Sequence, residues 1–192
     1  MTLVLKLFKN IFLLLFLWTG SAYGQLSAGD IAIIGHNIDN QNWAWITLTP
    51  IPAGEEIYFT DKGWTGTTWM STTEVHLLYT APVGGLTCGE IITCTETAPD
   101  VFSASSGTLV LASGTGWSTA AGDQILAYQS TTGPEPAAPT FITGLHGDYN
   151  AADFDAGTTW NTGSTDDLER SAVPTGLTNG TDCLSLFPGG PE

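Results

Sequence analysis

A run of oxygen-bearing side chains near the C-terminus could bind a divalent cation. The segment HGDYNAADFD, residues 146–155, contains three Asp and one Asn within eight positions. Ca²⁺ takes several oxygen ligands from a flexible loop, and carboxylate and amide groups supply them. The spacing differs from that of an EF-hand loop, so a solvated turn is the alternative interpretation. We therefore expect no cofactor other than a structural calcium ion, with the candidate ligands Asp148, Asn150, Asp153 and Asp155.

A second polar cluster, GHNIDNQNWAW at residues 35–45, raises the same question. Asn and Asp tolerate left-handed backbone conformations and bond to nearby backbone groups, so they are typical of tight turns. The cluster also lies between two apolar stretches, as the turn of a β-hairpin does. The pattern therefore favours a hairpin turn over a metal site, with the turn residues Asn37, Asp39, Asn40 and Asn42.

Motifs of the common enzyme classes are missing from the sequence. It has no Gly-x-Ser-x-Gly, no phosphate-binding glycine loop, no His-Glu-x-x-His and no Cys-x-x-Cys. The three histidines, His36, His76 and His146, are isolated from one another, and a lone histidine is more often a loop or packing residue than a ligand. Carboxylates are abundant enough to form the pair that a glycoside hydrolase needs. A catalytic residue is therefore not assigned, and a carboxylate-dependent hydrolase is kept as an alternative.

Tryptophans form the more informative pattern. Strand alternation in WAWITLT, residues 43–49, places the aliphatic side chains on one face and two tryptophans on the other. If the aliphatic face is the core, the tryptophans are exposed, and exposed aromatic rings stack on sugars or contact protein partners. Two further tryptophans lie in the polar segment DKGWTGTTWM. The candidate ligand-binding surface is thus Trp43, Trp45, Trp64 and Trp69, unless a second layer of structure covers them.

The elements that must position these residues are short strands. No long helical periodicity follows residue 24, and short apolar or alternating runs are separated by turn residues, with 23 Gly and 10 Pro in the chain. This pattern predicts an all-β, antiparallel β-sandwich of about nine short strands in a single domain at residues 25–192. The expected strands are Asp30–Ile34, Trp43–Thr49, Glu56–Thr60, Val75–Thr80, Glu90–Thr95, Thr108–Ala112, Gln124–Tyr128, Thr140–Thr143 and Cys183–Phe187.

The N-terminus and the net charge indicate where the chain acts. Lys6 and Lys9 precede a short apolar run, and small residues precede Gln25, so residues 1–24 are expected to be a signal peptide. We expect a secreted or cell-surface protein with no membrane span after cleavage near Gly24, because the apolar run is too short for one. The remaining chain has 19 acidic residues against Lys62 and Arg170, a formal charge of −17. Such a surface repels phosphates, so nucleic acid is not an expected partner.

Three cysteines follow the predicted signal peptide. Exported chains usually carry disulfides, so one bridge is expected with one thiol left over. Cys88 and Cys94 can pair only if the chain turns between them, because six residues of extended strand separate them too far. The pairing among Cys88, Cys94 and Cys183 is otherwise open.

Three segments in order resemble a known kind of module. They are residues 26–64 (LSAGDIAIIGHNIDNQNWAWITLTPIPAGEEIYFTDKGW), 121–129 (AGDQILAYQ) and 173–186 (VPTGLTNGTDCLSL). The pattern looks like an uncharacterised secreted bacterial module, similar in strand plan to the lamin-tail type of immunoglobulin-like sandwich. The resemblance implies an accessory role in attachment and brings no active site.

These observations lead to three hypotheses about function. The first is a non-catalytic binding, adhesion or accessory module whose partner is a polysaccharide or an extracellular protein. The second is a secreted hydrolase that uses a carboxylate pair, and the third is a structural spacer in a larger surface protein.

Overall fold

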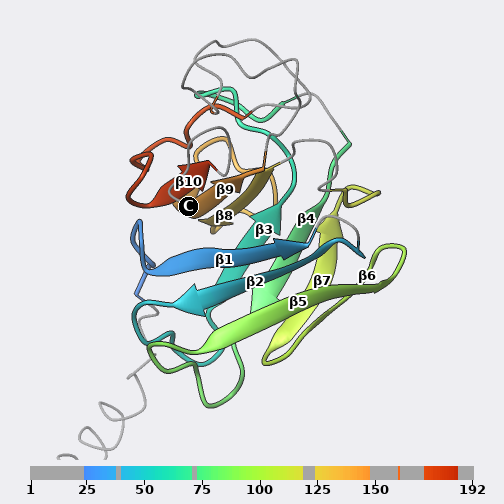
Figure 1. Cartoon of the computed structure of the whole chain (residues 1–192), viewed down its shortest axis with the longest axis vertical. Helices are drawn as coiled ribbons and strands as arrows, with labels where there is room; N and C mark the ends of the chain where they lie inside the picture. Colours follow the sequence, from blue (N-terminus) through green and yellow to red (C-terminus); the bar gives the residue numbers. More distant parts are fainter. Residues whose placement is uncertain are drawn as a thin grey trace, which may run out of the picture.

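The computed structural model describes residues 24–37, 40–70, 73–118, 124–147, 160 and 171–185. These residues form strands and turns arranged in two packed sheets (Figure 1). The predicted all-β sandwich is therefore confirmed. The strands are β1 (Ile31–Asn37), β2 (Asn42–Thr47), β3 (Glu56–Thr60), β4 (His76–Thr80), β5 (Ile91–Ala98), β6 (Val101–Ala104), β7 (Thr108–Ser113), β8 (Gln124–Gln129), β9 (Thr140–His146) and β10 (Cys183–Ser185).

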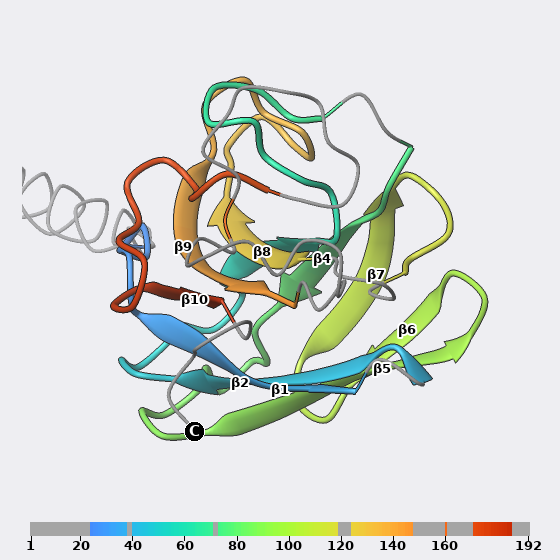
Figure 2. The same ribbon diagram turned by 45° about the horizontal axis from the view of Figure 1, so that its top comes forward.

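The two sheets differ in size and are almost wholly antiparallel. One has the order β1-β2-β5-β6, and the other has the order β10-β9-β8-β3-β4-β7. Only the β9–β10 pair is parallel among the described strands. Figure 2 shows the smaller sheet as one layer and the larger sheet as a second layer above it. The loops at residues 61–70 and 130–139 lie on the outer side of the larger sheet, away from the smaller sheet (Figure 2).

Each of the nine predicted strands overlaps an observed one, and β6 was not predicted. Its sequence, VFSA, has only two large apolar residues and is followed at once by Ser-Ser-Gly, so it gives little periodic signal. Pairing with β5 makes it a strand: Asp100 adopts a left-handed turn with φ of 60° between the two. The β-hairpin predicted at GHNIDNQNWAW is confirmed, because β1 and β2 pair with Asn37 opposite Asn42, and the predicted turn residue Asp39 lies outside the described residues.

The space between the sheets is filled by the face of β2 that was expected to be exposed. Trp43 and Trp45 are 2% and 0% exposed. Trp43 stacks on Trp117 with ring centroids 4.7 Å apart, and Trp45 meets Tyr79 edge-on at 5.1 Å. The aliphatic side chains of β2 face outward instead. An indole ring buries far more apolar surface than the aliphatic residues beside it, so the tryptophan face becomes the core.

The predicted disulfide is wrong, because Cys88, Cys94 and Cys183 are all free thiols. Cys94 is buried on β5 in the smaller sheet, Cys183 is buried on β10 in the larger sheet, and Cys88 is exposed in the turn before β5. The three side chains therefore belong to different parts of the sandwich. Among the residues described, no helix has the length and apolar character needed to cross a membrane.

Two further predictions fall on residues that the structure does not describe. The predicted signal peptide is one, apart from Gly24 at its end. The predicted calcium ligands Asp148, Asn150, Asp153 and Asp155 are the other. Within the described ranges, no group of three or more His, Cys, Asp or Glu side chains could hold a metal ion.

Candidate functional site

The central strands β8 and β9 of the larger sheet are buried on both faces. Every residue of β8 is buried, because one face packs against the smaller sheet and the other against a second apolar cluster. Trp64 is 3% exposed within this second cluster, where it meets Phe141 edge-on at 5.2 Å. Trp69 packs against the same cluster and is only half-buried. The expected exposed surface of four tryptophans is therefore wrong for Trp43, Trp45 and Trp64, and their rings serve as core.

The segment after β3 is fixed by a buried carboxylate. Asp61 is fully buried, and its two oxygens accept the backbone N–H groups of Val75 and Ser118, each at 2.8 Å. Burial raises the pKa of Asp61 to about 7, although these two N–H groups lower it. The Gln124 side chain donates to the Asp61 carbonyl and accepts from the N–H of Ser171 at 3.1 Å. Asp61 and Gln124 thus bond the segments that contain Val75, Ser118 and Ser171 to the chain after β3.

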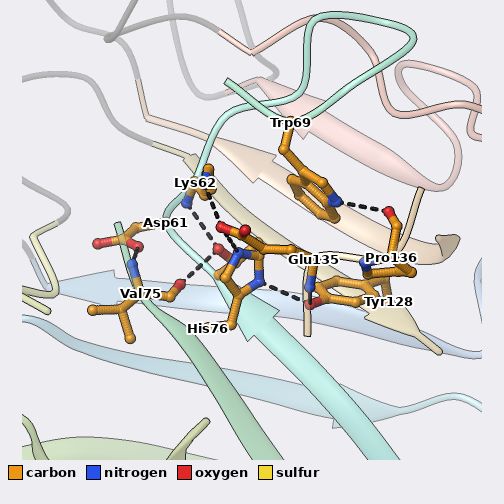
Figure 3. A network of polar contacts seen from close by, with 9 residues as sticks. Asp61, Lys62, Trp69, Val75, His76, Tyr128, Glu135 and Pro136 are labelled. Carbon is orange, nitrogen blue, oxygen red and sulfur yellow. Dashed lines mark hydrogen bonds and ion pairs between the residues drawn. The ribbon is translucent and has the colours of Figure 1, made fainter. Parts of the chain in front are cut away.

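A ring of hydrogen bonds lies beside Asp61 (Figure 3). The Lys62 ammonium contacts Oε1 of Glu135, and His76 Nε2 lies 3.2 Å from the same oxygen. The other imidazole nitrogen, Nδ1, lies 2.8 Å from the Tyr128 hydroxyl. That hydroxyl in turn accepts the backbone N–H of Glu135 at 3.3 Å. Four residues therefore form one connected network, and they come from the segment after β3, from β4, from β8 and from the loop that follows β8.

The network sets the protonation and the tautomer of His76. Burial lowers the pKa of His76 to about 4, against the opposing effect of Glu135, so the imidazole is neutral at pH 7. Because the Tyr128 hydroxyl accepts from the Glu135 N–H, its own hydrogen is directed to Nδ1, and the ring hydrogen lies on Nε2. Nε2–H then donates to the Glu135 carboxylate. Burial alone would raise the pKa of Glu135, but Lys62 and then His76 lower it below its usual value.

This network clamps the loop between β8 and β9, residues 130–139. Glu135 stands between two prolines and has a φ of 53°, which is uncommon for a residue with a side chain. Such a conformation persists only where surrounding contacts impose it. Here they come from the side chain and the N–H of Glu135, and from Trp69, whose Nε1 donates to the Pro136 carbonyl at 2.9 Å. The loop is therefore held in a single defined shape.

The clamped loop forms one wall of a surface pocket with a volume of about 530 Å³. Ser130, Thr131 and Gly133 contribute that wall. Tyr58 lines the floor and stacks on Tyr128 with ring centroids 5.2 Å apart, which connects the pocket directly to the hydrogen-bonded network. The remaining lining is polar, and its side chains are Gln25, Glu55, Glu56 and Gln129.

Gln129 organises the polar side of the pocket. Its Oε1 accepts the Leu26 N–H at 2.6 Å, and its Nε2 donates to Glu55 Oε1 and to the Glu56 carbonyl. Glu55 is 5% exposed, and its second oxygen, Oε2, has no hydrogen-bond partner in the described part of the chain. Burying a carboxylate oxygen without a donor is unfavourable. One oxygen of a residue beside the pocket is therefore a buried acceptor without a donor among the described residues.

Sequence reasoning missed both parts of this site. Lys62, His76, Tyr128 and Glu135 are too far apart in the chain to form a recognisable motif. Two local signals were nevertheless present: a Glu between two prolines at residues 134–136, and a Glu pair at residues 55–56 directly before a strand. A comparison of the chain with protein-family models, curated proteins and solved structures finds no match in any of the three. The function must therefore be argued from the site itself.

Proposed function

We propose that the protein is an exported, non-catalytic module that binds a polysaccharide through the pocket beside the loop at residues 130–139. Saccharide sites combine side chains that exchange hydrogen bonds with hydroxyl groups and an aromatic surface beside them. The pocket offers the amide of Gln25, the carboxylate of Glu56 and the ring of Tyr58, whereas Glu55 and Gln129 are buried and bonded to each other. Because Trp43 and Trp45 are buried, we propose this pocket as the binding site in place of their surface.

One observation carries the proposal: the pocket wall is held in place before any ligand arrives. Glu135 is fixed through its side chain and its N–H while its backbone stays left-handed, two residues from Gly133 in the pocket wall. A preformed wall lowers the entropy lost on binding, because the loop does not have to become ordered. A loop that served only as a connection between β8 and β9 would not require this clamp.

The arrangement of the two carboxylates favours binding over hydrolysis. Glycoside hydrolases direct two carboxyl groups at one glycosidic bond from opposite sides. Glu55 and Glu56 are consecutive residues at the start of a strand, and one is buried while the other is exposed. Neighbouring side chains in extended backbone point in opposite directions. The pair is therefore poorly placed to act on one bond.

The same proposal includes the type of sandwich and the place of action. We propose an immunoglobulin-like sandwich of the lamin-tail kind, supported by the segment resemblance and the two packed, mostly antiparallel sheets. Export is supported by the charged and apolar pattern of residues 1–24. N-terminal sequencing of the protein recovered from the medium tests export, and an N-terminus other than Gln25 would correct the cleavage site.

A blocking substitution tests the pocket without altering the core. Thr131 is exposed and lines the pocket, so Thr131→Trp should fill it and abolish retention on the polysaccharides that the wild type binds. Val83 is 97% exposed and does not line the pocket, so Val83→Trp is a matched control for an added surface indole. Affinity electrophoresis in gels containing individual polysaccharides provides the measurement. Equal retention of both variants would refute the proposed site, and no retention of the wild type in any gel would refute the function.

A further inference from the structure

A second surface pocket adjoins the pocket beside the loop at residues 130–139, which is called the first pocket below. The second pocket has a volume of about 440 Å³, and Gln25 lines both. Gln129 of β8 lines the first pocket, and Thr140 of β9, which lies opposite Gln129 in the register, lines the second. The two pockets are therefore neighbours across one pair of strands in the larger sheet.

An aromatic ring lines each pocket, and the two rings belong to one row. Tyr58 on β3 lies opposite Tyr128 on β8, which lies opposite Phe141 on β9. The ring centroids are 5.2 Å apart in the first pair and 6.2 Å apart in the second. Tyr58 lines the first pocket and Phe141 the second, so these rings lie on one face of the sheet, two strand spacings or roughly 10 Å apart. A ligand that occupies both pockets must therefore be longer than one sugar ring and must run across the strands.

Hydroxyl and amide groups supply the polar lining of the second pocket. Ser27, Thr140 and Thr175 contribute hydroxyl groups, and Gln25, which lies between the pockets, donates from Nε2 to Thr140 Oγ1 at 2.6 Å. None of the residues that line the second pocket is charged. An anionic sugar would find no Lys, Arg or His in the lining of either pocket, and it would have to approach a strongly acidic chain. The two linings therefore suit neutral sugars.

We infer that the two pockets form one site for a stretch of several sugars in a neutral polysaccharide, which runs across β3, β8 and β9 and occupies both pockets at once. This inference rests on the proposed polysaccharide-binding function, and it specifies the charge and the minimum length of the ligand. When one chain fills two adjoining pockets, the second contact forms within a ligand that is already bound, so it costs little further entropy. Affinity should therefore rise with the length of the oligosaccharide until both pockets are filled.

The first experiment tests the charge of the ligand. Affinity electrophoresis of the protein uses gels of neutral polysaccharides (mixed-linkage β-glucan, soluble starch and glucomannan) and gels of anionic ones (alginate and polygalacturonate). At least one neutral gel should retain the protein more strongly than either anionic gel. Retention by an anionic gel that equals or exceeds that by every neutral gel would overturn the inference and leave the proposed function intact. Retention by no gel would overturn both.

The second experiment tests the length of the ligand. Fragments of two and five sugars are prepared by partial acid hydrolysis of the neutral polysaccharide that retains the protein best, and each is titrated by isothermal calorimetry. The five-sugar fragment should bind at least about tenfold more tightly, because only the longer fragment reaches both pockets. Equal affinities would show that one pocket holds the whole contact, which would overturn the inference but not the proposed function.

Blocking variants assign the gain in affinity to the two pockets. Ala28 is exposed and lines the second pocket, so Ala28→Trp should fill it, as Thr131→Trp fills the first. Each variant should bind the five-sugar fragment about tenfold more weakly than the wild type. Val83→Trp adds an indole away from both pockets and should bind it unchanged. Wild-type affinity for this fragment in Ala28→Trp would overturn the second pocket, even where Thr131→Trp supports the first.

Discussion

Two buried titratable groups in the structure should affect stability in opposite directions as the pH falls. The pKa of Asp61 is about 7 in the folded chain and 3.8 for an ordinary Asp, so between these values the folded chain holds a proton that the unfolded chain lacks. Asp61 therefore makes the protein more stable as the pH falls through this window. The pKa of His76 is about 4 when folded and 6.5 ordinarily, so the unfolded chain takes up the proton first. His76 therefore makes the protein less stable as the pH falls.

The magnitudes follow from these shifts. Between pH 7 and pH 4.5, Asp61 should add about 3 kcal/mol to the free energy of unfolding, and His76 should remove about 2 kcal/mol. The wild type should therefore change little over this range on account of these two groups. The separate effects become visible in Asp61→Asn and His76→Gln, which each remove one titration. On acidification, His76→Gln should gain about 2 kcal/mol more than the wild type, and Asp61→Asn about 3 kcal/mol less.

Urea unfolding monitored by tryptophan fluorescence at pH 7, 6 and 4.5 provides the measurement. Both substitutions also remove hydrogen bonds, but that loss is common to all pH values and cancels when each variant is compared with itself. Val83→Ala changes an exposed, non-titrating side chain and should follow the wild type throughout. Profiles of Asp61→Asn and His76→Gln that run parallel to the wild type would show that neither group titrates abnormally, and would refute the reasoning.

Three further predictions concern the core, the pocket and the thiols. Trp43→Ala should lower the free energy of unfolding by about 3–5 kcal/mol in chemical denaturation, because it empties a site that is 2% exposed; a loss below about 1 kcal/mol would contradict its place in the core. Gln129→Ala should cost about 1–3 kcal/mol in the same assay, since the Leu26 N–H and a Glu55 oxygen lose their buried partner, and an unchanged midpoint would count against this tether. In the native protein one thiol, Cys88, should react with a maleimide, whereas Cys94, whose pKa is raised to about 12 by burial, should react only after unfolding. Mass spectrometry that finds a disulfide, or native labelling of Cys94, would contradict this assignment.

Local patterns in the sequence predicted the strands well, and the reason is physical. A strand is defined by alternation and by the turn residues at its ends, and both signals lie within a few positions. The predicted strand Glu56–Thr60 has the same bounds as β3. The face of β2 was predicted wrongly because both of its faces are apolar. Which face becomes the core then depends on Phe59, Tyr79 and Trp117, which lie far away in the chain.

The site could not be predicted because its members meet only through the sheet order and the path of one loop. Glu135 lies 59 residues from His76 and 73 residues from Lys62. Because β3 pairs with β4, Lys62 follows β3 at the end where β4 begins with His76. The loop that carries Glu135 leaves β8 at the opposite end, beside Glu56, and Glu135 reaches His76 and Lys62 only through the way this loop folds back. The sequence marked each residue only by type. A lysine in a chain with few cations was a third such signal, beside the glutamate between prolines and the glutamate pair at residues 55–56.

Lys62 contributes more to this acidic protein from its buried position than it would from the surface. On the surface, a lysine among many carboxylates would contribute little, since exposed ion pairs are screened and flexible. Lys62 is instead 6% exposed, where its charge is directed at Glu135 and fixes a loop with a left-handed residue. The carboxylates of Glu55 and Glu56 have no such internal partner in the pocket lining. The same chain therefore pairs the carboxylate that shapes the pocket wall with its cation and leaves the carboxylates of the pocket lining without a cationic partner in that lining.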